Sequence, residues 1–76
     1  MLNTLDLKPG FILRFKSFGN TEKRLRIRLM VLGLMPGVEV KLVRVAPLGC
    51  PLYFNLGEIN LALRKDEAKH LLWEKL

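Results

Sequence analysis

The chain has little of what enzyme active sites are built from. It holds one cysteine and one histidine among 76 residues. Neither of them, nor the hydroxyl of Ser17 or Thr21, lies at a spacing that pairs a nucleophile with a base. The adjacent carboxylates of Asp66 and Glu67 would point in different directions on a helical turn. The sequence therefore predicts a protein that is not an enzyme, with no catalytic residues and no cofactor.

The same scarcity argues against a dedicated metal site. Such a site needs several His, Cys, Asp or Glu ligands that converge on one point. Cys50 and His70 alone would not complete a coordination shell. We therefore expect no metal-binding residues. The single cysteine also excludes a disulfide within the chain.

Long hydrophobic runs and a leader segment are missing as well. The apolar runs are only a few residues long, whereas a helix needs about 20 to cross a bilayer. No basic and then apolar opening segment suggests a signal peptide. Together with the lone cysteine, these absences predict a protein of the reducing cytoplasm.

Acidic residues are outnumbered, with 7 Asp and Glu against 13 Lys and Arg, which gives a net charge of +6. Such an excess is typical of proteins that meet nucleic acid or an acidic membrane surface. Nucleic-acid surfaces also carry aromatic rings for stacking on bases. Only Tyr53 and Trp73 are expected to be surface rings, and neither adjoins the basic cluster of residues 14–28. A solvated basic face is the simpler interpretation.

Apolar residues make up 50% of the chain, and the sequence predicts one mainly β domain over residues 1–76. Alternating apolar residues predict five strands, over residues 11–16, 38–45, 52–56, 59–63 and 71–75. A helix is predicted over residues 22–32, with Asn20 or Thr21 as its N-cap, and one helical turn over residues 65–70. Five short strands with one helix after the first indicate a small SH3-like barrel, whose closure would leave little strand edge exposed.

Two strands carry more detailed expectations. In the strand over residues 38–45, the apolar side chains of Val40 and Leu42 are followed by those of Val43 and Val45. The apolar phase therefore slips by one residue, and a β-bulge near Leu42 and Val43 would absorb the slip. The strand over residues 59–63 is expected to place three side chains in the core: Ile59, Leu61 and Leu63.

Glycine and proline mark the turns. Gly33 lies where the end of the helix needs a residue with positive φ. Pro36 and Gly37 fit the two central positions of a type II turn. A similar pair occurs at residues 9–10, and each pair precedes a predicted strand. We interpret the two pairs as two corners of one barrel.

The predicted helix carries apolar side chains on two faces. Leu25, Leu29 and Leu32 form the stripe that is expected to face the barrel. Ile27, Met30 and Val31 lie on nearly the opposite side. A helix with one buried face does not need them, so either another segment covers them, such as the loop of residues 46–51, or they form a recognition patch.

Three motifs together resemble a known family. They are R-L-x-x-L-G-L-x-P-G over residues 28–37, V-R-V-A-P-L-G-C-P over residues 43–51, and L-A-L-R-K-D-E-A over residues 61–68. The set is similar to FeoA, the small cytosolic component of bacterial ferrous iron uptake. Cys50 departs from the pattern, because this position is commonly aspartate or another polar residue. The SH3-like domain of some iron-dependent repressors shares part of the pattern.

The resemblance implies a protein-interaction module that supports or regulates ferrous iron transport. Its partner would be the cytosolic, GTPase-bearing part of the permease FeoB, at the inner face of the cell membrane, so that contact with the membrane is indirect. The alternatives are a basic nucleic-acid-binding barrel, a repressor-type SH3-like domain and a GTPase activator with an arginine finger. The residues expected to bind the partner are Ile27, Met30, Val31, Leu48, Cys50 and Tyr53. Those expected to shape the turns are Gly33, Pro36, Gly37, Pro47 and Gly49.

Overall fold

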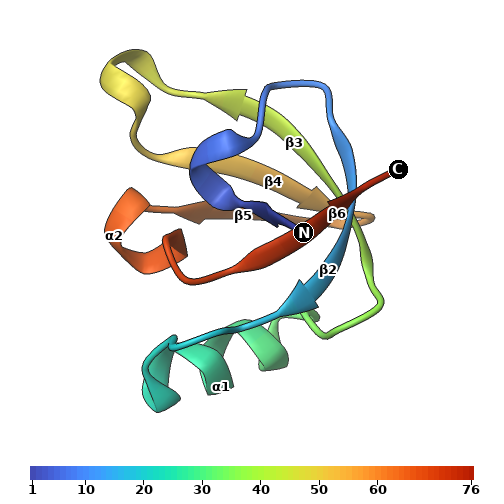
Figure 1. Cartoon of the computed structure of the whole chain (residues 1–76), viewed down its shortest axis with the longest axis vertical. Coiled ribbons are helices and arrows are strands. Elements are labelled where there is room, and N and C mark those ends of the chain that lie inside the picture. The colour runs from blue at the N-terminus through green and yellow to red at the C-terminus, as the bar shows by residue number, and fades with distance from the viewer.

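The computed structural model describes residues 1–76, which form one antiparallel sheet of six strands with two short helices (Figure 1). The strands are β1 (Leu2–Asn3), β2 (Ile12–Ser17), β3 (Glu39–Val45), β4 (Leu52–Leu56), β5 (Ile59–Leu63) and β6 (Leu72–Lys75). The helices are α1 (Lys23–Val31) and α2 (Lys65–Ala68), with 3-10 helices at Thr4–Asp6 and Pro47–Gly49. The spatial order of the strands is β1-β6-β2-β3-β4-β5.

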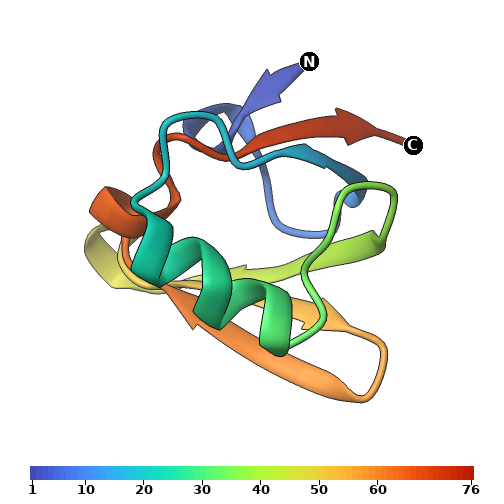
Figure 2. The same ribbon diagram turned by 90° about the horizontal axis from the view of Figure 1, so that it is seen from below.

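The predicted SH3-like architecture is confirmed, with α1 inserted after the first long strand. Figure 2 shows α1 lying across the opening of the curled sheet, with β2 on one side and the β4–β5 hairpin on the other. Neither helix has the length and apolar character of a membrane-spanning segment.

Two expectations were wrong. A sixth strand, β1, pairs with β6, and the sheet stays open with β1 and β5 as its edges, so closure does not remove the exposed edge.

An aromatic cluster centred on Trp73 forms the middle of the core. The indole stacks on Phe54 of β4, with ring centroids 5.1 Å apart and planes 10° apart. It also meets Phe15 of β2 edge to face at 5.2 Å. The expectation that Trp73 is a surface ring was wrong, because its side chain is completely buried. The alternation of side chains along β6 points the indole into the core. There it contacts β2 and β4, which belong to different halves of the sheet.

Thr4 completes the surroundings of Trp73. Its hydroxyl accepts a hydrogen bond from the indole Nε1 at 2.9 Å and donates one to the backbone carbonyl of Ala68 at 2.6 Å. The residue is buried, although it lies near the N-terminus. One hydroxyl therefore holds the N-terminal segment, α2 and β6 together.

The end of α1 follows the sequence closely. Gly33 has φ of 105°, and its N–H donates to the carbonyl of Met30 at 3.0 Å. The N–H of Leu34 donates to the carbonyl of Leu29, also at 3.0 Å, and both leucine side chains are buried. These bonds form the Schellman arrangement, in which the glycine lets the chain turn back and cover the last helical turn.

The start of α1 differs from the prediction. Neither Asn20 nor Thr21 caps it; Glu22 occupies the cap position, without a side-chain hydrogen bond. The Thr21 hydroxyl donates instead to the carbonyl of Phe18. That local bond competes with capping, because a threonine hydroxyl can serve either the helix or the preceding turn.

The two Pro-Gly turns are held by the same hydrogen-bond pattern. The N–H of Gly10 donates to the carbonyl of Leu42, and that of Gly37 donates to the carbonyl of Phe15. Each acceptor strand returns a bond to the residue after the glycine, from Leu42 N–H to Phe11 and from Phe15 N–H to Val38. This repeated pattern supports the interpretation of the turns as two corners of the barrel.

The predicted bulge is present in β3, where the pairing with β4 shifts between Leu42 and Arg44. Its effect on the side chains differs from the expectation. Val43 is the extra residue and is exposed, while Val45 packs against the core. Ile59, expected inside, is also exposed, because it adjoins the hairpin turn at the end of the sheet.

Replacing Thr4 by valine tests the buried hydroxyl. We expect Thr4→Val to lower the free energy of unfolding by about 1–3 kcal/mol, because the indole N–H would stay buried without a partner and the Ala68 carbonyl would keep only its bond from the Leu71 N–H. Thr4→Ser is the control, since it keeps the hydroxyl. Urea unfolding followed by the fluorescence of Trp73 gives both values. Equal stability of the valine and serine variants would contradict this role.

Candidate partner-binding surfaces

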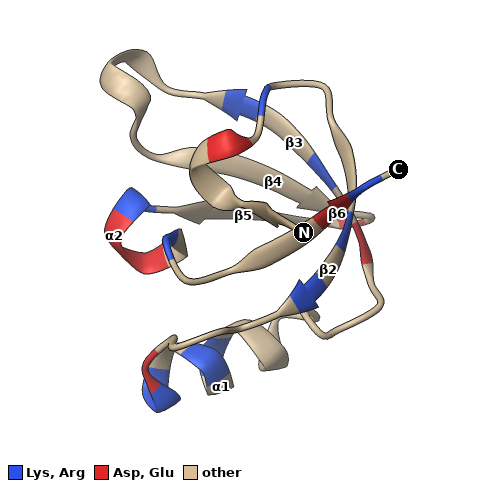
Figure 3. Cartoon of the chain, viewed as in Figure 1, with Lys and Arg blue, Asp and Glu red and all other residues tan.

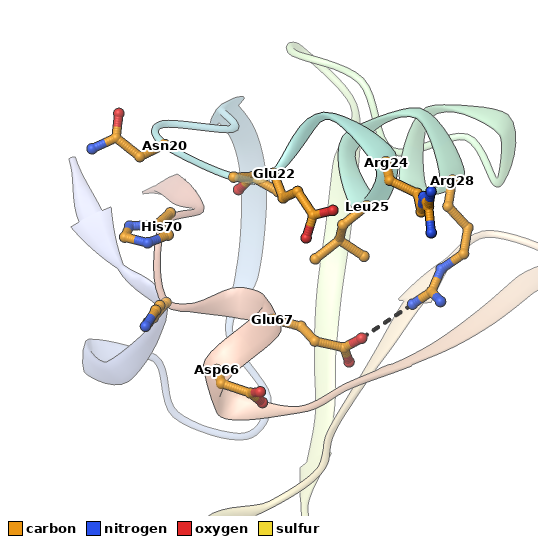
Figure 4. A pocket seen from close by; sticks show the side chains of 10 residues that line it. Asn20, Glu22, Arg24, Leu25, Arg28, Asp66, Glu67 and His70 are labelled. Carbon is orange, nitrogen blue, oxygen red and sulfur yellow. Dashed lines mark hydrogen bonds and ion pairs between the residues drawn. The ribbon is translucent and has the colours of Figure 1, made fainter.

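A hollow of about 510 Å³ lies between α1 and α2 (Figure 4). Its lining is almost entirely polar: Asn20, Thr21, Glu22, Arg24, Leu25, Arg28, Asp66, Glu67, Lys69 and His70. The guanidinium of Arg28 bridges it, with its nitrogen 3.2 Å from a carboxylate oxygen of Glu67. The other oxygen of Glu67 accepts the backbone N–H of Arg64 at 3.0 Å. One oxygen of Glu67 thus joins α2 to α1, and the other caps the start of α2.

The side chains that line this hollow hold α1 and α2 together and do not form a site for a charged ligand. Basic and acidic side chains alternate around it, so the lining does not present charge of one sign to a ligand. No group of three or more His, Cys, Asp or Glu residues is placed to hold a metal ion anywhere in the chain. Neither His70 nor Cys50 therefore belongs to a cluster of potential ligands.

The outer face of α1 carries three exposed apolar side chains, which we call the helix patch. Ile27 is 49% exposed, Met30 43% and Val31 81%. The opposite stripe packs as predicted, with Leu29 completely buried and Leu25 and Leu32 against the core. All three side chains are therefore accessible to solvent. The loop of residues 46–51, one of the segments that could have covered them, lies at the opposite end of the molecule from α1 (Figure 1).

A second apolar feature is Leu48, at the tip of the loop between β3 and β4. Its side chain is 100% exposed and its backbone has φ of 69°. A leucine rarely adopts this left-handed conformation, which costs about 1–3 kcal/mol. Two backbone bonds fix the loop: Gly49 N–H to the Ala46 carbonyl at 2.9 Å, and Ala46 N–H to the Pro51 carbonyl at 3.0 Å. The loop therefore holds an apolar side chain out in solvent.

The structure does not bring all six predicted partner-binding residues together. α1 and the loop between β3 and β4 lie at opposite ends of the molecule (Figure 1), so the expectation that the helix and the loop are neighbours was wrong. Cys50 is half-buried in the loop of Leu48. The predicted turn residues do shape the backbone, since Gly33, Gly37 and Gly49 all have positive φ.

Tyr53 lies on a third surface, the outer face of β3 and β4. The guanidinium carbon of Arg44 sits 4.8 Å from the centre of the Tyr53 ring, which is a cation–π contact. The two line a shallow hollow of about 410 Å³ together with Val43, Phe54 and Asn60. Val43 could not be recognised from the sequence as a surface residue, because its apolar side chain fits the core pattern of the strand. Only the bulge in β3 turns it outward.

The positive charge is distributed around the molecule. Figure 3 shows Lys and Arg on α1, β2, β3 and both ends of α2, with acidic residues interspersed. Trp73 is buried, so Tyr53 is left as the ring expected on the surface, and its face is occupied by Arg44. The surface therefore offers little of the ring stacking on a basic face that nucleic-acid binding would favour.

The family follows from comparison with known proteins. The model of a family described as the FeoA domain matches residues 4–75. This chain belongs to the FeoA family. The exposed surfaces above are thus features of a FeoA domain.

Solved structures of other FeoA proteins share the fold. The chain is 35% identical to FeoA from Chlorobium tepidum, with a TM-score of 0.91, over 99% of this chain and 70% of that one. It is 35% identical to iron(II) transport protein A from Clostridium thermocellum, with a TM-score of 0.86, over 99% of this chain and 46% of that one. A Stenotrophomonas maltophilia FeoA, solved with zinc and described as an SH3 domain protein, is 27% identical, with a TM-score of 0.79, over 97% of this chain and 91% of that one. The FeoA family is accordingly associated with ferrous iron transport.

The zinc complex of that relative makes metal binding worth measuring here. We expect no stoichiometric, tight site for zinc or iron(II) in this chain, because no cluster of ligands is present. Calorimetric titration at neutral pH under reducing conditions measures this directly. A submicromolar site that disappears in Cys50→Ser or His70→Ala would contradict the expectation.

Proposed function

We propose that this FeoA domain is a non-catalytic interaction module that docks on the cytosolic part of the FeoB permease and thereby supports or regulates ferrous iron transport. It would act in the cytoplasm at the inner face of the membrane. The observation that carries the proposal is the helix patch: Ile27, Met30 and Val31 stand exposed on a helix whose other face is anchored in the core.

The three side chains of the helix patch can contribute to binding, but their burial is not enough for a tight complex. Full burial of one such side chain contributes about 1.5–3 kcal/mol, and these three begin roughly half exposed or more. Together they would contribute on the order of 3–6 kcal/mol, whereas association costs an estimated 4–15 kcal/mol. The patch alone would therefore bind weakly, and further contacts are needed.

Two features supply the further contacts. Lys23, Arg24 and Arg26 lie on the same helix as the patch and would form a basic rim that selects an acidic partner surface. Leu48 would form a separate apolar anchor on the other side of the domain. A partner that engages both surfaces must reach around the barrel. We therefore expect the contributions of the two surfaces to be separable.

Charge substitutions test the docking. Met30→Asp and Leu48→Asp should each reduce co-purification with detergent-solubilised FeoB by tenfold or more, because a charge in a desolvated interface is costly. Both variants should melt within a few degrees of the parent, since both side chains are exposed. The measurement pairs thermal melts with quantified co-purification.

Leu29→Asp and Lys8→Asp provide the controls. Leu29 is completely buried one position from Met30, so its substitution should unfold a domain whose whole stability is on the order of 5 kcal/mol. Lys8 is exposed and lies outside both surfaces, so Lys8→Asp should bind normally. If Met30→Asp and Leu48→Asp melt normally and still bind like the parent, the chosen surfaces are not the docking site.

A further inference from the structure

The outer edge of β5 is unprotected. β5 is the last strand of the sheet and pairs only with β4 (Figure 2). Natural proteins commonly protect such an edge with lysine, proline or a bulge. The five residues Ile59–Leu63 contain no charged residue and no proline, and their pairing with β4 is regular.

The backbone groups on this edge can be assigned from the hairpin. A two-residue turn makes Leu56 and Ile59 a hydrogen-bonded pair, and the pairs alternate from there. Asn60 and Ala62 therefore belong to pairs without mutual hydrogen bonds, so their N–H and C=O groups point away from β4. Both residues are exposed, and no backbone bond to another segment uses these groups.

We propose that this edge pairs antiparallel with the β5 edge of a second copy of the chain, forming a two-fold symmetric dimer with a continuous sheet. Leu61 would lie on the two-fold axis, and Asn60 would face Ala62 of the second copy. Each such pair exchanges two hydrogen bonds, so the two symmetric pairs give about four. An isologous interface of this kind requires a self-complementary patch.

Charge provides the self-complementarity. In this register Glu58 lies opposite Arg64 of the second copy, and the symmetry repeats the pair at the other end. Glu58 and Arg64 are both exposed, and neither makes an ion pair within its own chain. A shift of two residues in either direction removes both pairs: one shift places Glu58 opposite Ala62, the other places Arg64 opposite Asn60. Opposite charges directly across a strand pair stabilise it, so they select this register.

The dimer is expected to be weak and to depend on concentration, because the strands are short. Sedimentation velocity from micromolar to millimolar protein should show a monomer that becomes a dimer. Amide hydrogen exchange followed by NMR should show the Asn60 and Ala62 amides exchanging freely in dilute protein and protected in concentrated protein. This readout reports the edge itself and does not involve FeoB.

A charge swap tests the register. Glu58→Lys and Arg64→Glu should each weaken dimerisation by roughly tenfold, since each turns two cross-strand attractions into repulsions. The double variant Glu58→Lys with Arg64→Glu should recover the parent value within about threefold. Thermal melts confirm that each variant is folded.

Two further variants complete the design. Ala62→Pro should abolish the dimer while leaving β4–β5 pairing intact, because it removes an N–H that β4 does not use. Met30→Asp should leave the dimer unchanged, since the helix patch lies outside this edge. The proposal is overturned by a monomer at all concentrations, by a dimer lost in Met30→Asp but kept in Ala62→Pro, or by a double variant that is no better than the single ones.

Discussion

The structure depends above all on how the Trp73 indole is enclosed. Its ring is stacked on Phe54 from across the barrel and flanked by Phe15 from the neighbouring strand, while its N–H is satisfied by Thr4. Aromatic contacts of this type contribute about 0.5–1.5 kcal/mol each beyond area burial. In a chain of 76 residues, where one small core must suffice, this cluster links both halves of the sheet, the N-terminal segment and α2.

A core fixed in this way determines what is left over at the surface. α1 is anchored by Leu29 beneath and by the Leu34 return above Gly33, so it cannot rotate to bury its second apolar face. The loop of Leu48 is likewise held by its own backbone bonds. The apolar side chains at both places are therefore exposed because of the architecture, and a rigid exposed anchor loses little entropy when a partner covers it.

Much of the fold could be predicted from the sequence, because local rules and packing agree there. The five longer strands, the α1 termination at Gly33 and the bulge in β3 all follow from periodicity and turn chemistry. Features set by distant contacts could not be predicted. β1 is too short to show a pattern, and the burial of Trp73 depends on Thr4, 69 positions away. The separation of the helix patch from Leu48 likewise depends on the path of the whole chain, since both segments flank β3 in sequence.

The central claim is that the outer face of α1 is a contact surface for FeoB. Methyl NMR of labelled protein titrated with the purified cytosolic part of FeoB tests it most directly. The account predicts that the methyl signals of Ile27, Met30 and Val31 shift or broaden, while that of Ile12, exposed on β2, stays unchanged. Unchanged signals on α1 together with shifts at Ile12 would contradict the claim.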